Sequence, residues 1–375
     1  MRSAFRAAPW RPVGALATLL WLVSPSVAAA QSNDDAGGAQ PASEGPAAAG
    51  PLRISERNPL YHLFLTPMVL EADLMGRGEA WVGSSMAYSN VFEYNSSPVL
   101  RQLFDLERLH AAFVFRRGVT DNVEFGAQLG FQHNWHGFLD PLIQGVHTTF
   151  GFPNADREKR PNNAYGLRLE GVGEQAATYL DLPAGIALDA PRVFVAWRIA
   201  GGRAHTHAVS ARTTLKLPLG DARVSTRRSD VAFEIAGRRS WGPNHLHISG
   251  GAVVLNSPRM LEPLMQPVAA LGSVAYERTV SNSVSLLAQF SGESAYTRGQ
   301  GIAELTGAAV NFAVGAAGRF GTWEWQASFA EDVPPNSPSV DFTFDLQLAR
   351  RWPQRARSAV RDQPATREDD RPGSL

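Results

Sequence analysis

The sequence contains no cysteine, which in an exported chain excludes disulfide bonds, thiol catalysis and thiolate metal sites. It also lacks an excess of either charge, with 35 Lys and Arg against 35 Asp and Glu, so no net field attracts nucleic acid. After residue 30, no stretch approaches the roughly 20 consecutive apolar residues that a membrane-spanning helix needs. These absences argue against a nucleic-acid-binding protein and against a helical inner-membrane protein.

Residues 1–30 have the pattern of a secretory signal peptide. Arg2, Arg6 and Arg11 precede an apolar run over residues 13–23, and Pro25 then breaks the helical pattern. Small residues at 28–30 fit a signal peptidase, so the sequence predicts cleavage after Ala30 and export from the cytoplasm.

The two ends of the remaining chain differ in composition from its centre. Residues 31–57 are rich in Ala, Gly, Pro and Ser and have no periodic apolar face, which predicts a disordered periplasmic leader. Residues 353–375 form a polar segment that we also expect to be disordered. The sequence therefore predicts one folded domain over residues 58–352.

Within that domain, apolar and polar residues alternate with a period of two. In residues 123–132, Val, Phe, Ala, Leu and Phe occupy one face, while Glu, Gly, Gln, Gly and Gln occupy the other. Residues 322–329 and 341–352 repeat the pattern. Since a pleated strand sends successive side chains to opposite faces, one face suits lipid and the other suits water. This is the pattern of a transmembrane β-barrel strand.

The same period predicts an all-β fold, an antiparallel transmembrane β-barrel of about 12 strands with a short helix in one long extracellular loop. The even strand count places both ends of the barrel on the periplasmic side, where we also expect the tight turns, among them those at residues 241–244 and 320–321. The expected strands cover residues 79–92, 106–117, 123–134, 191–199, 204–217, 229–238, 245–256, 267–277, 284–292, 305–319, 322–330 and 339–352.

The face predicted to point inward carries many charges. A soluble β-sandwich also alternates, but its core could not bury so many charged side chains at a cost of several kcal/mol for each unpaired one. The pattern therefore favours a barrel with a polar lumen. The predicted lumen residues are Arg108, Arg116, Glu124, Gln128, Arg198, Arg212, Glu234 and Arg319.

One connection, residues 135–190, is much longer than ordinary loops, which favours a functional role. Apolar residues at helical spacing predict a short amphipathic helix over residues 137–150, and its apolar stripe comprises Leu139, Leu142, Ile143 and Val146. We expect the stripe to pack against inward strand ends, so that the loop folds into or over the outer mouth. The predicted mouth residues are Asp140, His147, Asp156, Arg157 and Arg160, although a solvated turn would also explain the polar run.

Several short motifs resemble one protein family. They are Asn58-Pro59-Leu60, the turn at residues 118–122, the segment 137–140 with His147, and the run from Asp156 to Pro161. Together they resemble an uncharacterised bacterial outer-membrane family, domain of unknown function 3187. The resemblance implies an outer-membrane barrel of a Gram-negative bacterium with no established activity. The chain departs from many barrels in placing a polar tail after Trp352, where the insertion machinery often meets an aromatic terminus.

Three functional classes remain open on this sequence. A narrow channel or transporter for an unknown small solute suits the mixed lumen charges, and about 12 strands leave little room for a wide pore. A barrel-embedded lipid-modifying enzyme would need a nucleophile and base such as those offered by His245, His247 and Ser249. A structural or adhesive surface barrel is the third class. We assign no catalytic residue, metal ligand or cofactor, and expect outer-membrane lipid, lipopolysaccharide and the barrel-insertion machinery as partners.

Overall fold

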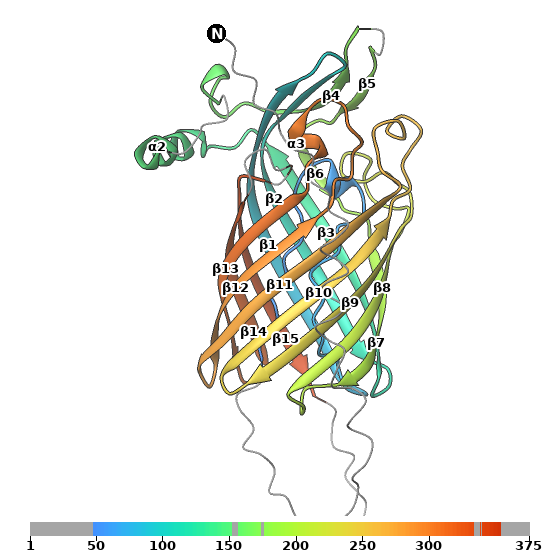
Figure 1. The fold of residues 1–375 in the computed structure, drawn as a ribbon, viewed down its shortest axis with the longest axis vertical. Coiled ribbons are helices and arrows are strands. Elements are labelled where there is room, and N and C mark those ends of the chain that lie inside the picture. The colour runs from blue at the N-terminus through green and yellow to red at the C-terminus, as the bar shows by residue number, and fades with distance from the viewer. Residues whose placement is uncertain (1–47, 152–156, 174–175, 334–337, 339, 354–375) are drawn as a thin grey trace, which may run out of the picture. The chain divides into compact units, whose positions relative to one another are not determined.

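The computed structural model describes residues 48–151, 157–173, 176–333, 338 and 340–353 (Figure 1). All of them belong to the second of two compact units, Gly45–Leu375. The predicted signal peptide, most of the predicted leader and almost all of the C-terminal tail lie outside the described residues. No helix among the described residues is long and apolar enough to cross a membrane.

Twelve antiparallel strands form a closed barrel, which confirms the predicted fold class. The barrel closes where the first strand pairs with the last, from Ala80 opposite Trp352 to Asn90 opposite Phe342. The barrel strands are β1 (Ala80–Ser96), β2 (Leu100–Gly118), β3 (Val123–Trp135), β7 (Arg192–Gly201), β8 (His207–Lys216), β9 (Asp230–Trp241), β10 (Asn244–Val254), β11 (Val268–Ser281), β12 (Val284–Glu293), β13 (Ala309–Phe320), β14 (Trp323–Asp332) and β15 (Phe342–Trp352). Every predicted strand overlaps one of these.

Three short strands in the long 135–190 connection were not predicted. They are β4 (Gly166–Gly171), β5 (Thr178–Asp181) and β6 (Gly185–Leu188). β4 pairs with the outer end of β2, and β6 pairs with the outer end of β3 (Figure 1). Segments of four to six residues are too short for a period of two to be distinguished from chance.

The outward face of the strands is apolar, as the alternation predicted. Leu129 on β3 is 38% exposed and Phe344 on β15 is 45% exposed, whereas their neighbours Gly130 and Asp345 are buried inside the barrel. A soluble surface would not expose so many large apolar side chains around its whole circumference. The strands therefore form a transmembrane β-barrel with a lipid-facing exterior.

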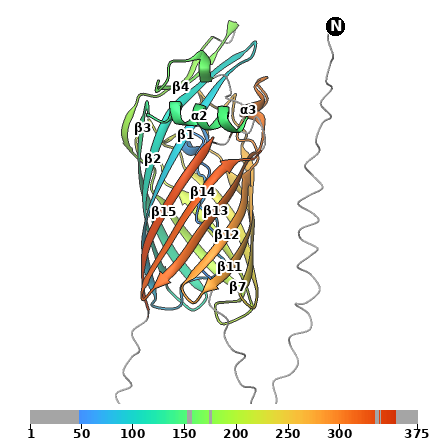
Figure 2. The ribbon, with the colours of Figure 1, turned by 90° about the vertical axis from the view of Figure 1, so that its left-hand side faces the viewer.

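The tight turns gather at the end of the barrel where β1 begins and β15 ends (Figure 2). Two of them depend on glycine. Gly242 between β9 and β10 has a φ of 55°, and Gly321 between β13 and β14 has a φ of 60°. Residues with a side chain rarely adopt this left-handed backbone conformation, which two-residue hairpin turns often require. The sequence predicted turns at both places, and we take this end as the periplasmic end.

The largest difference from the predicted organisation is the position of the segment that precedes β1. Residues 48–79, which we call the plug, run inside the barrel toward its outer end, turn at the short 3-10 helix η2 (Tyr61–Leu63), and return to the start of β1 (Figure 1). Residues 50–57 were predicted to be part of a disordered leader, yet all but Ser55 are buried. The folded domain therefore begins about ten residues earlier than Asn58.

Candidate functional site

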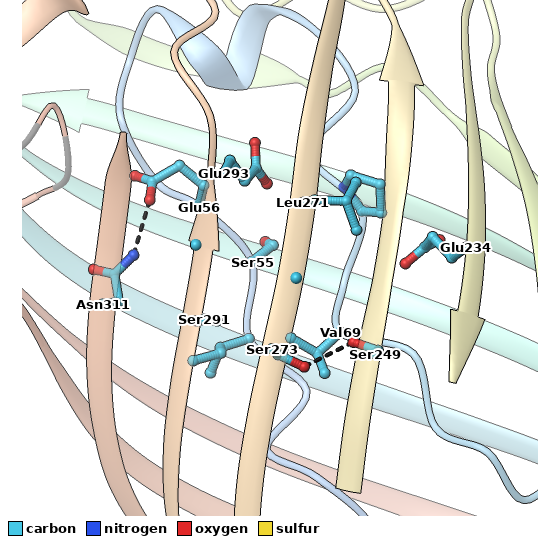
Figure 3. Close-up of a pocket in the computed structure, with 14 residues that line it drawn as sticks. Ser55, Glu56, Val69, Glu234, Ser249, Leu271, Ser273, Ser291, Glu293 and Asn311 are labelled. Atoms are coloured by element: carbon cyan, nitrogen blue, oxygen red, sulfur yellow. Dashed lines mark hydrogen bonds between the residues drawn. The ribbon is translucent and has the colours of Figure 1, made fainter. Parts of the chain in front are cut away.

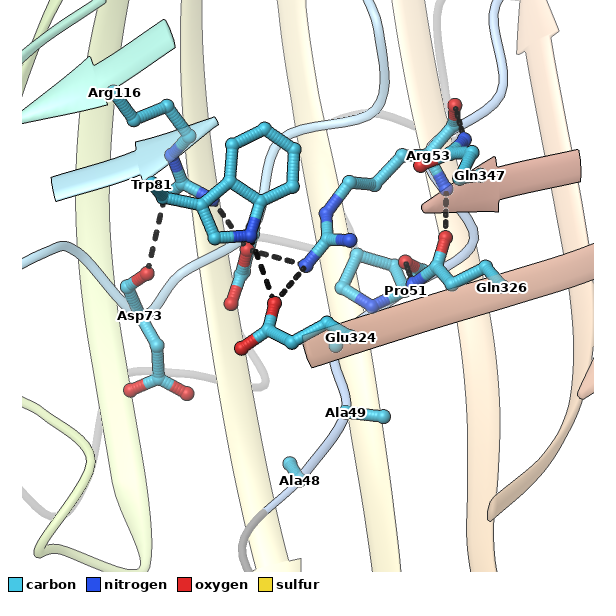
Figure 4. Close-up of polar contacts among 12 residues, drawn as sticks. Ala48, Ala49, Pro51, Arg53, Asp73, Trp81, Arg116, Glu324, Gln326 and Gln347 are labelled. Carbon is cyan, nitrogen blue, oxygen red and sulfur yellow. Dashed lines mark hydrogen bonds and ion pairs between the residues drawn. The ribbon is translucent and has the colours of Figure 1, made fainter. Parts of the chain in front are cut away.

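Three glutamines of the barrel wall hold the ascending part of the plug by its backbone. Gln289 on β12 accepts a hydrogen bond from the N–H of Leu52 (2.9 Å) and donates one to the carbonyl of Leu52 (3.1 Å). Gln326 on β14 accepts from the N–H of Arg53 (3.1 Å), and Gln347 on β15 donates to the carbonyl of Arg53 (2.8 Å; Figure 4). The plug contributes only backbone N–H and C=O groups to these bonds. The side chains of the plug therefore carry no sequence pattern that would indicate them.

Charged pairs hold the descending part of the plug. Arg116 on β2 donates to Glu124 on β3 (2.6 Å) and to Glu71 of the plug (2.8 Å). Glu71 also lies 3.4 Å from the guanidinium of Arg53, which belongs to the ascending part. All four side chains are buried. One plug carboxylate thus connects both limbs of the plug to the wall.

The other predicted lumen residues also occupy inward positions of their strands. Arg212 pairs with Glu234 (2.9 Å), Arg108 donates to the carbonyl of Arg57 (2.9 Å), and Arg319 donates to the carbonyl of Ala48 (3.0 Å). Gln128 and Arg198 are half-buried. These residues lie on the inward face of the wall, and the sequence did not identify the chain segment that several of them bind.

The outer part of the lumen is filled by apolar side chains. Tyr61 at the turn of the plug stacks on Tyr296 of the β12–β13 connection, with ring centroids 4.2 Å apart, and Phe64 packs edge-on against the same Tyr296 ring. Leu305 of the short helix α3 (Ala303–Thr306) and Leu264 of the β10–β11 connection belong to the same buried cluster. The plug thus has an apolar tip enclosed by outer loops and a polar base bound to the wall.

A buried group of His62 in the plug, His110 on β2 and Asp189 in front of β7 has a composition that metal ions accept. Both imidazoles instead point their Nε2 atoms at one Asp189 oxygen, at 3.2 and 3.3 Å. Arg57 lies 2.8 Å from Nδ1 of His110, and because a guanidinium can only donate, that Nδ1 must accept and Nε2 must carry the hydrogen. A metal on Nε2 would require the opposite tautomer, so the geometry favours a hydrogen-bonded connection between plug and wall.

Burial of the plug imidazole supports the same interpretation. It lowers the pKa of His62 to about 4, so the ring is neutral at neutral pH and donates one N–H to Asp189. Asp189 lies at the end of the long 135–190 connection, which thereby contributes a carboxylate to the contact between plug and wall.

The spaces between plug and wall are small. One cavity of about 30 Å³ lies beside Ser55 and Glu56 of the plug and is bordered by Ser273 and Glu293 of the wall (Figure 3). A second cavity of about 30 Å³ lies beside Trp81 and Phe194. Each has room for roughly one or two water molecules, which is too little for a solute. Neither of these two cavities could hold a solute.

Three of the predicted mouth residues fasten the long loop to the outer ends of β1 and β2. Arg157 donates to Asp140 (2.9 Å) and to Asn90 on β1 (2.6 Å), and it also pairs with Asp341. Arg160 donates to Asp105 on β2 (2.8 Å). His147 is half-buried on the loop helix, and Asp156 lies outside the described residues. These contacts place Asp140, Arg157 and Arg160 at the barrel wall.

The predicted loop helix is present as α2 (Asp140–Phe150), but its expected packing was wrong. Ile143 is buried, whereas Leu142 is 63% and Val146 is 42% exposed. Figures 1 and 2 show α2 beside the outer end of the barrel, crosswise to the strands, and not above the lumen. The plug fills the space that we expected this loop to occupy.

The histidine and serine side chains considered for an enzyme do not form a nucleophile and base pair. The Ser249 hydroxyl lies 2.7 Å from the hydroxyl of Ser273, and His247 faces Glu277 at 3.0 Å. Glu277 in turn accepts a hydrogen bond from the backbone N–H of Ala49 in the plug (2.7 Å). This group connects the periplasmic part of the wall to the plug.

The family model described as protein of unknown function (DUF3187) matches residues 38–352. The chain belongs to the DUF3187 family. The matched range includes the whole described plug as well as all twelve barrel strands, so in this DUF3187 protein the plug is part of the family domain. No curated protein matches the chain.

Solved structures similar to this DUF3187 protein are outer-membrane barrels of low sequence identity. The COG4313 outer membrane channel from Pseudomonas putida F1 is 12% identical, with 75% of this chain and 98% of that chain covered and a TM-score of 0.49. The translocator domain of the autotransporter NalP from Neisseria meningitidis is 9% identical, with 74% and 90% covered and a TM-score of 0.38. These values are too low to support an argument about what the DUF3187 protein transports or binds.

Proposed function

We propose that this protein is an outer-membrane channel for small solutes and that the plug, residues 48–79, is its gate. The observation that supports the proposal is the polarity of the wall behind the plug, where Gln289, Gln326, Gln347 and the Arg116–Glu124 pair bind it. A plug that never leaves the lumen could be held equally well by apolar packing against the wall. A polar wall can exchange its bonds to the plug for bonds to water, so the plug can move away at moderate cost.

The long 135–190 connection has a smaller part in this gate than its length suggested. Its helix lies beside the barrel, but Asp189 at its end holds His62 of the plug and His110 of the wall. In the proposed mechanism this connection stabilises the closed state at the outer end of the lumen through Asp189. The charges of Asp140, Arg157 and Arg160 act at the mouth only after the plug has moved.

The proposed location is the bacterial outer membrane, reached after cleavage of the signal peptide following Ala30. The apolar exterior fits lipid and the acyl chains of lipopolysaccharide, and a closed barrel leaves no unpaired strand edge in that environment. Assembly of such a barrel would use the outer-membrane insertion machinery, with β1 and β15 as the strands that close it.

Replacing the three plug-binding glutamines with alanine should open the channel. The triple variant Gln289→Ala, Gln326→Ala, Gln347→Ala removes five hydrogen bonds to the plug backbone and leaves the barrel strands paired. We expect single-channel recordings in planar bilayers to show openings at least ten times as frequent as those of the parent protein.

The matched control for this variant is Gln132→Ala, because Gln132 is also buried on the inward face but its carboxamide makes no hydrogen bond. The control should conduct like the parent protein. A gel shift on heating shows whether the triple variant is folded. If the folded triple variant opens no more often than the parent protein, the proposal that the plug is a gate is wrong.

A further inference from the structure

The loop helix α2 presents an apolar side that no part of the described chain covers. Leu142 and Val146 lie one turn apart on the same side of the helix and are both exposed. Phe138, four residues before Leu142 and just before the helix, is 64% exposed as well. Asp140, on the opposite side, and Ile143, at the edge of the stripe, are buried against the protein. An exposed stripe on a helix that is otherwise fastened to the barrel needs an apolar partner other than water.

The N-terminal end of α2 lies beside a group of aromatic side chains on the barrel exterior. The Tyr88 ring of β1 packs against Trp135 at the end of β3, with centroids 5.7 Å apart, and against Phe138, with centroids 6.4 Å apart. Tyr88 is opposite Phe344 of β15, which is exposed on the lipid-facing surface. Aromatic side chains at the edge of the apolar band mark the membrane interface of such barrels. The helix therefore begins at the level where the outer leaflet ends.

The direction of the helix agrees with this level. In Figures 1 and 2, α2 runs crosswise to the barrel strands, beside their outer ends, so that it lies along the plane of the membrane. Asp140 at its start is held by Arg157, which is also bound to Asn90 on β1. The helix is thus fixed to the barrel at one end while its length extends over the surrounding membrane.

We propose that α2 is an interfacial anchor whose stripe of Phe138, Leu142 and Val146 is buried among the acyl chains of outer-leaflet lipid. The stripe begins at Phe138, which contacts the aromatic group, and the aromatic group adjoins the apolar exterior at Phe344. A short amphipathic helix that lies in the interface with its apolar side toward the acyl chains is a known way to bind a membrane. This role does not depend on whether the barrel conducts.

The absence of cysteine allows a direct test with single fluorescent labels. Leu142→Cys and Val146→Cys place a bimane on the stripe, and Thr148→Cys, also exposed but on a different side of the helix, is the matched control. Leu286→Cys on β12 is the reference for a lipid-facing position. The labelled proteins are reconstituted in vesicles of phosphatidylethanolamine and phosphatidylglycerol, with and without doxyl-labelled lipid.

The labels at 142 and 146 should be quenched by doxyl lipid at least threefold more than the label at 148, and should approach the label at 286. Iodide in the buffer should quench in the reverse order. Equal quenching of all three helix labels by iodide, with no effect of doxyl lipid, would overturn the proposal. Protection of positions 142 and 146 from both quenchers would indicate a protein partner in place of lipid and would overturn it as well.

Discussion

Replacing Lys216 with methionine should lower the free energy of unfolding by about 3–5 kcal/mol, the range for a buried ion pair that loses one partner. The Lys216 ammonium group lies 2.8 Å from Asp230 and donates to the carbonyl of Leu63 in the plug at 2.7 Å. Both charged side chains are at most 1% exposed. Methionine fills a similar volume but leaves the Asp230 carboxylate without its charge partner, so the loss reflects an unpaired buried charge.

Arg228→Met is the control for this variant, because it removes a positive charge that is exposed in the β8–β9 connection and should change stability by less than about 0.5 kcal/mol. Urea unfolding of the barrel in detergent micelles or vesicles measures both variants. A double variant with Asp230→Asn should recover part of the loss, since it removes the unpaired charge. Equal stability of Lys216→Met and Arg228→Met would show that the pair does not hold the plug and wall together.

Arginine at position 129 should be almost as damaging, at a cost of about 2–4 kcal/mol for a charge on the lipid face near the bilayer midplane. Leu129 points outward near the middle of β3, and its neighbour Gln128 points inward and is half-buried. An arginine at 129 must therefore enter the lipid or pull the strand toward the interface. Leu129→Met keeps the apolar contact and should cost less than about 1.5 kcal/mol.

The comparison that tests the register is Gln128→Arg, at nearly the same depth but on the lumen face. It should be tolerated far better than Leu129→Arg, even though Arg192 on β7 lies opposite. Folding yields into lipid vesicles and urea midpoints both report the difference. Similar losses at 128 and 129 would contradict the assignment of the two faces.

The barrel could be predicted from the sequence because the alternation of apolar and polar residues within each strand identifies its lipid-facing and lumen-facing sides. Phe125 and Leu129 alternate with Glu124 and Gln128 within one segment, and the pleat alone converts that order into lipid and lumen sides. The turn at Gly321 was predictable for the same reason, because the glycine provides a local backbone requirement. Features that depend on a few neighbouring residues were therefore visible without the structure.

The plug could not be predicted because its partners are far away in the chain. Leu52 bonds to Gln289, 237 residues later, and Arg53 bonds to Gln326, 273 residues later. The segment 48–57 has little apolar pattern because wall glutamines and carboxylates satisfy its backbone, and such a segment resembles a disordered linker in composition. The predicted lumen charges were a signal that could have suggested it, since so many buried charges in a narrow barrel need partners.

The helix α2 shows an intermediate case. The spacing of Leu142, Ile143 and Val146 predicted a helix, and the helix is there. The same spacing could not say what covers the stripe, because lipid and a barrel mouth are both apolar partners. The position of the helix depends on Arg157, which binds Asp140 at the start of the helix and Asn90 on β1. The helical spacing gives no information about these contacts.

Two cysteine pairs can test whether the plug is a gate, since the chain contains no other thiol. Leu52→Cys with Ala313→Cys places one thiol on the plug and one on the wall within the same buried apolar cluster. Ala313→Cys with Ala330→Cys joins two neighbouring wall strands at opposed positions and leaves the plug free. The second pair shares one substitution with the first and controls for the effect of a disulfide on the barrel itself.

Single-channel current under oxidising and then reducing conditions is the measurement that tests the gate most directly. With the plug joined to the wall at 52 and 313, we predict that oxidised protein stays at the closed level and that a reductant restores the openings of the parent protein. The wall pair at 313 and 330 should open equally in both conditions. Openings as frequent in the oxidised 52–313 protein as after reduction would contradict the account, because ions would then pass without movement of the plug.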